Sequence, residues 1–189
     1  MVKLKRTKDE IITKAEQLAT EYEAKYKGCG QCTFLAILDA LRWGGLEIIP
    51  MDMEDRFFPG ICVLTGGVGL SGDGTCAAVA SGSLAIGLAL GMQRETFNEA
   101  RFRENCYIVR SSLLSTYYER YNSLLCKDIQ RKFFGKAWDL TRDDTGAEFL
   151  GITEGCVIME TAKLATRIIL DEFEKGNARG YVGGPEGKA

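Results

Sequence analysis

The feature that most constrains the fold is an uncharged stretch, CAAVASGSLAIGLALGM, that runs from Cys76 to Met92. It is apolar, but Ser and Gly interrupt it, and it falls short of the ~18 uninterrupted apolar residues that indicate a membrane span. A helix of this composition has no polar face to present to water. Its Ala, Gly and Ser residues also let neighbouring helices approach closely. We therefore expect a buried central helix around which the rest of the chain packs.

The segments on either side of this stretch have the apolar period of amphipathic helices. Thr7 and Glu10 form a capping-box pattern ahead of the first apolar stripe. The segment 44–60 is punctuated by Gly and Pro, which indicates a connector, and only 61–65 resembles a short strand. Further helices are expected at about residues 30–43, 94–122, 124–134 and 154–174.

These patterns predict an all-α fold, a single-domain helical bundle of about five to seven helices with a glycine-rich loop before the buried central helix. A chain of 189 residues is long enough to bury the core of one domain. We expect this helical domain to cover residues 1–175 and a flexible C-terminal tail to cover residues 176–189.

The glycine-rich loop, GGVGLSGDGTC at residues 66–76, contains the spacing G-x-G-x-x-G. A dinucleotide-binding fold also needs alternating strands and helices, which this sequence lacks, and a P-loop needs a lysine after the glycines. We interpret the loop instead as a device that delivers Cys76 to the first turn of the central helix, with Asp73 or Thr75 as the cap. The loop residues expected to contact a cofactor there are Gly67, Gly69, Gly72 and Thr75.

The sequence contains seven cysteines and no histidine. The lack of histidine excludes Ser-His and Cys-His catalysis, histidine-ligated haem and mixed Cys/His zinc sites. A cytosolic chain with many cysteines uses them as reduced thiols, metal ligands or redox pairs more often than as structural disulfides. The expected chemistry is therefore sulfur chemistry.

Four of the cysteines fall near the expected starts of four helices. Free backbone N–H groups and the positive end of the helix dipole favour a thiolate at such a position, and the thiolate is the reactive and metal-binding form. The repeated placement suggests that these helix ends converge on one site. The four residues are Cys29, Cys76, Cys126 and Cys156.

The segments that carry these cysteines are CGQCTFLAILDALRWGGLE, TCAAVASGSLAIGLALG, YNSLLCKDIQRKFFGKAWDL and GCVIMETAKLATRIIL. Together they resemble the bacterial and archaeal family named for its cysteine pattern, C_GCAxxG_C_C, over roughly residues 5–175. That family is described as redox-active, and related sequence accompanies an iron-sulfur site in split-Soret cytochromes. The resemblance implies that the family cysteines correspond to Cys29, Cys76, Cys126 and Cys156.

The sequence departs from the family pattern at one motif. Where the family has G-C-A-x-x-G, this chain has Thr75 and Ala80 in place of the two glycines, although the cysteine and the alanine match. A haem-attachment motif, C-x-x-C-H, is also missing, because Thr33 follows the CGQC sequence.

Three redox or metal-binding functions remain open from the sequence, beside that of a metal-free binding module. The first is an iron-sulfur or related metal site on the four cysteines, for electron transfer or redox sensing. The second is a metal-free thiol-disulfide oxidoreductase that uses Cys29 and Cys32 of the C-x-x-C sequence. The third is a structural zinc site with the same four cysteine ligands. Of the other cysteines, Cys62 could approach Cys76, and Cys106 lies on an apolar stripe that indicates a core position.

The charge and the N-terminal segment bear on partners and location. A formal net charge of -2 gives no indication of a nucleic-acid or acidic-membrane partner. The charged, helical N-terminal segment lacks the apolar core of a signal peptide, which predicts a cytoplasmic protein. The expected partner is a redox protein that the sequence does not identify, with a homodimer as one option for the assembly. Whether the protein is an enzyme is left open.

Overall fold

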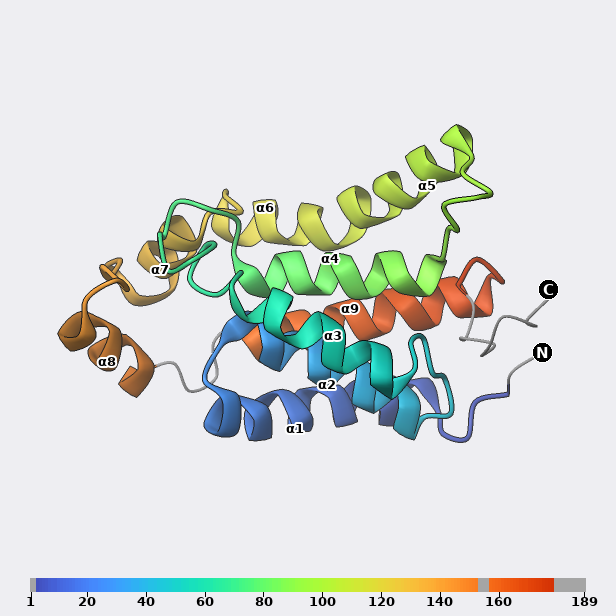
Figure 1. Cartoon of the computed structure of the whole chain (residues 1–189), viewed down its shortest axis with the longest axis horizontal. Helices are drawn as coiled ribbons and strands as arrows, with labels where there is room; N and C mark the ends of the chain where they lie inside the picture. Colours follow the sequence, from blue (N-terminus) through green and yellow to red (C-terminus); the bar gives the residue numbers. More distant parts are fainter. Residues whose placement is uncertain (1–2, 153–156, 179–189) are drawn as a thin grey trace.

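The computed structural model describes residues 3–152 and 157–178, and these ranges are helical, without any strand (Figure 1). The predicted all-α, single-domain fold is therefore confirmed. The helices are α1 (Lys8–Tyr26), α2 (Cys29–Trp43), α3 (Met51–Cys62), α4 (Ala77–Leu90), α5 (Glu99–Val109), the π-helical segment η1 (Arg110–Leu114), α6 (Ser115–Tyr121), α7 (Cys126–Phe134), α8 (Asp143–Ile152) and α9 (Val157–Glu174).

The core forms where α1, α2, α4 and α9 pack together. Helix α1 packs against α2 and α9, while α4 packs against α2 and α9 from the other side. The predicted burial of the central helix is confirmed, since α4 carries fully buried residues along its length. Its small residues permit a close approach, because a Cβ added at Gly82 would lie 3.0 Å from the Thr161 methyl carbon on α9.

The first helix begins as its capping box predicts. The Thr7 backbone N–H donates to the Glu10 carboxylate at 2.8 Å, and the Glu10 N–H donates to the Thr7 hydroxyl at 3.3 Å. The apolar stripe of α1 then faces the core through Ile11, Ala15 and Leu18. Capping and amphipathic period together explain why this segment is helical.

Two expectations for residues 44–65 are wrong. Most of the expected connector is helix α3, which starts after Pro50 and has acidic residues in its first turn. It includes Pro59, whose side chain faces solvent. The expected strand at 61–65 is instead the last turn of α3 and the turn that follows it. The Arg42 side chain of α2 donates to the Glu54 carboxylate at 2.7 Å, so an ion pair fastens α3 to the bundle.

The expected long helix at 94–122 is present but begins later. Asn98 caps α5 by accepting a hydrogen bond from the Arg101 N–H at 2.9 Å. The helix then continues through the wider turn of η1 into α6. None of the residues of α5 is buried, and this helix projects from the bundle (Figure 1). The core position expected for Cys106 is therefore wrong, because this thiol is exposed.

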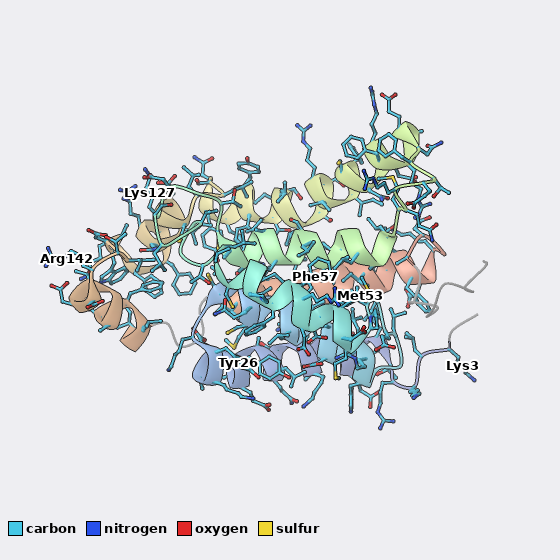
Figure 2. The ribbon with its side chains drawn as sticks, viewed as in Figure 1. Lys3, Tyr26, Met53, Phe57, Lys127 and Arg142 are labelled. Atoms are coloured by element: carbon cyan, nitrogen blue, oxygen red, sulfur yellow. The ribbon has the colours of Figure 1, made fainter. Side chains whose placement is uncertain are left out.

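Helices α7 and α8 form one end of the molecule (Figure 1). Helix α8 was not expected from the sequence, although Asp143 and Asp144 in its first turn are typical of a helix start. Figure 2 shows Lys127 and Arg142 at this same end. Most of the predicted C-terminal tail, residues 179–189, lies outside the described residues. Within the described ranges, every helix is too short or too polar to cross a membrane.

Candidate functional site: a cavity lined by three cysteines

Three of the four cysteines singled out by the sequence stand at helix N-termini. Cys29 is the first residue of α2, Cys126 is the first residue of α7, and Cys76 is the N-cap residue of α4. The expected placement at helix starts is therefore confirmed for these three. Cys156 lies outside the described residues, and the next residue in the sequence, Val157, opens α9.

Backbone hydrogen bonds hold two of these cysteines next to one another. The Cys76 N–H donates to the Leu124 carbonyl at 2.7 Å, and the Cys126 N–H donates to the Gly74 carbonyl at 3.0 Å. The glycine-rich loop thus pairs with the segment before α7, although the two are far apart in the sequence. This pairing brings the N-termini of α4 and α7 together.

Gly67 occupies the closest approach between the glycine-rich loop and α7. Its φ is +76°, and a Cβ added there would lie 2.8 Å from the Cys126 Cβ and 3.0 Å from the Gly74 carbonyl oxygen. Only glycine combines this backbone conformation with that spacing. The loop therefore needs glycine at this position to bring its backbone against Cys126.

The expected caps of α4 are wrong. Cys76 itself is the N-cap residue, and none of the described side chains accepts a capping hydrogen bond there. Asp73 forms an ion pair with Lys127 of α7 instead, and Thr75 is exposed. The loop is fixed by its own backbone pairing with the segment before α7, so these side chains are directed away from the helix start.

The three cysteines line one cavity of about 200 Å³. We call Cys29, Cys76 and Cys126 the thiol end of this cavity. Its aromatic end consists of Phe133 and Phe134 from α7 and Phe149 from α8, with aliphatic residues between the two ends. Val157 and Ile158 at the start of α9 also line it. The convergence predicted from the sequence is therefore confirmed for the three described cysteines.

Burial raises the pKa of all three thiols. It raises the pKa of Cys126 to about 11 and raises the pKa of Cys76 well above its ordinary value, and neighbouring cysteines raise both further. Burial also raises the pKa of Cys29, against the opposing effect of the backbone N–H groups of Gly66 and Ala77. The sequence predicted that the helix N-termini would favour thiolates, but burial has the larger effect on the pKa of Cys29.

Gln130 orients the Cys126 thiol. It lies one helical turn after Cys126, is 3% exposed, and donates from its amide nitrogen to the Cys126 sulfur at 3.2 Å. Its amide oxygen accepts a hydrogen bond from the Trp138 backbone N–H at 3.0 Å. These two bonds fix the side chain, so Gln130 couples the thiol end to the chain that leads into α8.

The loop residues expected to contact a cofactor lie beside the cavity rather than in its lining. The cavity is lined from this loop by Thr65, Gly66 and Leu70. The residues named from the sequence were Gly67, Gly69, Gly72 and Thr75, and no described contact tests whether they bind a cofactor. Gly67 does not line the cavity, but its backbone packs closely against Cys126, which does.

The other cysteines of the described chain have separate surroundings. Cys32 is fully buried and donates from its thiol to the Tyr22 carbonyl at 3.2 Å, between α1 and α2. Burial raises its pKa to about 12. Cys62 is half-buried at the end of α3 and does not line the cavity. All six described cysteines are free thiols.

The thiol end is a group of three thiols that line one cavity. Among residues 3–152 and 157–178, no three or more Cys, Asp or Glu side chains form a group that could hold a metal ion. Cys156 is not among these residues.

The sequence did not reveal the aromatic end or Gln130. The spacing of Gln130, four residues after Cys126, places both on one face of α7, and this is the signal that could have identified it. Phe149 belongs to the aromatic end because it lies on α8. The two acidic residues in the first turn of α8 are the sequence signal that could have identified this helix.

The fold and the cavity together define a class: an all-α protein in which cysteines at separate helix N-termini meet in an apolar cavity. The family model described as "Putative redox-active protein (C_GCAxxG_C_C)" matches residues 27–168. The chain therefore belongs to this family. Comparisons with curated proteins and with solved structures find no match.

Proposed function

We propose that this protein holds an iron-sulfur cluster on Cys29, Cys76, Cys126 and Cys156 and uses it for electron transfer or redox sensing. The observation that carries the proposal is that three separate helices each bring an N-terminal cysteine to the same cavity. Four thiolates are the ligand set of the common clusters, and the fourth here is assigned from the family pattern.

The chemical type of the donors around the thiol end suits such a group. The ligating atoms are all sulfur, and the backbone N–H groups of Gly66, Ala77 and Ala78 lie close enough to Cys29 to act on its pKa. N–H groups of this kind can donate to cluster sulfides, and an apolar shell tunes the reduction potential. When bound, the cluster supplies one-electron transfer. The raised thiol pKa values mean that ligation displaces protons.

Val157 supports the assignment of the fourth ligand. It lines the cavity and directly follows Cys156 in the sequence. Zinc on the same four cysteines is the alternative metal. The Cys29 and Cys32 pair is less favoured, because Cys32 donates to the Tyr22 carbonyl instead of facing the cavity.

Metal and acid-labile sulfide analysis of anaerobically purified protein tests the proposal. We expect iron and sulfide together with a broad visible absorbance. Cys76→Ser should remove both, whereas Cys106→Ser, which changes an exposed cysteine outside the cavity, should retain them. A colourless protein with stoichiometric zinc would assign the zinc alternative, and unchanged iron in Cys76→Ser would refute the shared site.

A further inference from the structure

The cavity opens to solvent through an apolar mouth. Leu70, Phe133 and Leu150 all line the cavity, yet they are 41%, 45% and 45% exposed. They come from three segments: the glycine-rich loop, α7 and α8. Large apolar side chains at an opening favour the entry of an apolar molecule over that of an ion.

The aromatic end of the cavity offers ring faces and edges in several orientations. The Phe134 and Phe149 rings lie edge to face, with centroids 6.0 Å apart and planes at 87°. Phe133 contacts Phe134 with a centroid distance of 4.9 Å, and Trp138 packs against Phe134 at 5.5 Å. A planar aromatic ligand can pack favourably against these side chains, because aromatic rings prefer offset-stacked or edge-to-face arrangements.

The volume and the charges of the cavity limit its ligand further. An apolar cavity of about 150 Å³ is known to bind benzene. The cavity here measures about 200 Å³ with its thiol end included, so its ligand has at most one or two rings. The charged lining residues are Glu23 and Lys27, both at the C-terminal end of α1. The rest of the lining is mostly apolar, so an ionic ligand at the aromatic end would lose its hydration there without gaining a charged partner.

We propose that the aromatic end of this cavity binds a small, uncharged, planar aromatic molecule of one or two rings. The inference rests on the proposed function in one respect: it names the chemical class of molecule that reaches the redox site. Binding itself depends only on the lining of the cavity. The ligand enters between Leu70, Phe133 and Leu150 and lies with one edge toward the thiol end.

Binding of 2-naphthol to the full-length, anaerobically purified protein tests this inference, with naphthalene-2-sulfonate as the charged counterpart. Isothermal titration calorimetry should show one saturable 2-naphthol site per chain, and the sulfonate should bind about tenfold more weakly or worse, a difference of about 1.4 kcal/mol. The absence of saturable 2-naphthol binding would overturn the proposal. Equal affinity for the two compounds would do the same.

Two substitutions on α8 locate the site. Leu150→Glu places a carboxylate at the mouth, and it should weaken 2-naphthol binding by about tenfold. Ile152→Glu is the matched control, because Ile152 is 44% exposed on the same helix but does not line the cavity. It should leave the affinity unchanged. Equal effects of the two substitutions would contradict the assigned position.

A third substitution removes an aromatic wall without adding charge. Phe149→Leu should weaken 2-naphthol binding several-fold, whereas Phe97→Leu, in a ring pair with Phe102 away from the cavity, should not. Iron and sulfide are measured on the same preparation. Cluster content without 2-naphthol binding would refute only this inference, and 2-naphthol binding without any cluster would refute only the proposed function.

Discussion

Replacement of Gly67 by alanine tests how the glycine-rich loop supports the thiol end. Gly67 and Gly69 both have left-handed backbone conformations, with φ of +76° and +59°. They differ in surroundings: a Cβ at Gly67 would lie 2.8 Å from the Cys126 Cβ, whereas a Cβ at Gly69 would meet open space. The pair therefore separates the backbone cost of alanine from the cost of the close contact.

The two costs can be worked out separately. A left-handed conformation costs a residue with a Cβ about 1–2 kcal/mol, and this applies to both positions. Overpacking against Cys126 and the loop backbone adds about 1–3 kcal/mol at Gly67 only. The entropy that alanine removes from the unfolded chain is the same in both variants and cancels in the difference between them. Gly67→Ala should therefore lower the free energy of unfolding by about 1–3 kcal/mol more than Gly69→Ala does.

Urea unfolding followed by circular dichroism measures both values under the same conditions. Thiol alkylation in the folded state gives a second measurement, because Gly67→Ala should displace Cys126 and change the rate of its modification. Equal destabilisation by the two substitutions, with unchanged alkylation of Cys126, would refute the argument that the loop needs glycine to approach this cysteine.

Two further predictions concern the thiol end. In protein stripped of any bound metal, the free energy of unfolding should fall as the pH rises from about 9 to 11. The unfolded chain loses the Cys126 proton near its ordinary pKa, while burial holds the folded pKa at about 11, and each unit of difference is worth about 1.4 kcal/mol. Urea midpoints that stay constant over this range would contradict the prediction. Gln130→Leu should lower the free energy of unfolding by about 1–3 kcal/mol, because it leaves the buried backbone N–H of Trp138 without its acceptor. It should also shift the pH profile of Cys126 alkylation to higher pH, because the hydrogen bond from Gln130 lowers the pKa of this thiol. Mass spectrometry of the peptide that contains Cys126 measures this profile. Lys132→Leu, on the exposed face of α7, is the control. Identical profiles in the two variants would show that Gln130 does not act on the thiol.

The sequence predicted those parts of the fold that depend on the local pattern. The uncharged run from Cys76 identified the central helix, because a helix without a polar face has to be buried. The capping box at Thr7 identified the start of α1 for an equally local reason. Helix α3 was missed, since Gly and Pro around it indicate a connector, while its attachment depends on the ion pair between Arg42 and Glu54 from another helix.

The site was predictable where it depends on sequence position and unpredictable where it depends on burial. The placement of Cys29, Cys76 and Cys126 at helix starts could be deduced from the flanking sequence. Their raised pKa values could not, because desolvation depends on the helices that enclose them. The aromatic end is unpredictable for the same reason: it requires α7 and α8 to meet, and no local pattern specifies that packing.

The pairing between the glycine-rich loop and the segment before α7 has a consequence for how this sequence can diverge. Thr75 and Leu125 form an antiparallel bridge, and the hydrogen bonds that the Cys76 and Cys126 N–H groups donate across it end on backbone carbonyls. Thr75 is not among the residues with positive φ, so the backbone places no demand for glycine where the family motif has one. The side chains of Thr75 and Leu125 can therefore change while these backbone bonds keep the two cysteines aligned. Divergence from the motif at Thr75 thus leaves the alignment of Cys76 and Cys126 intact.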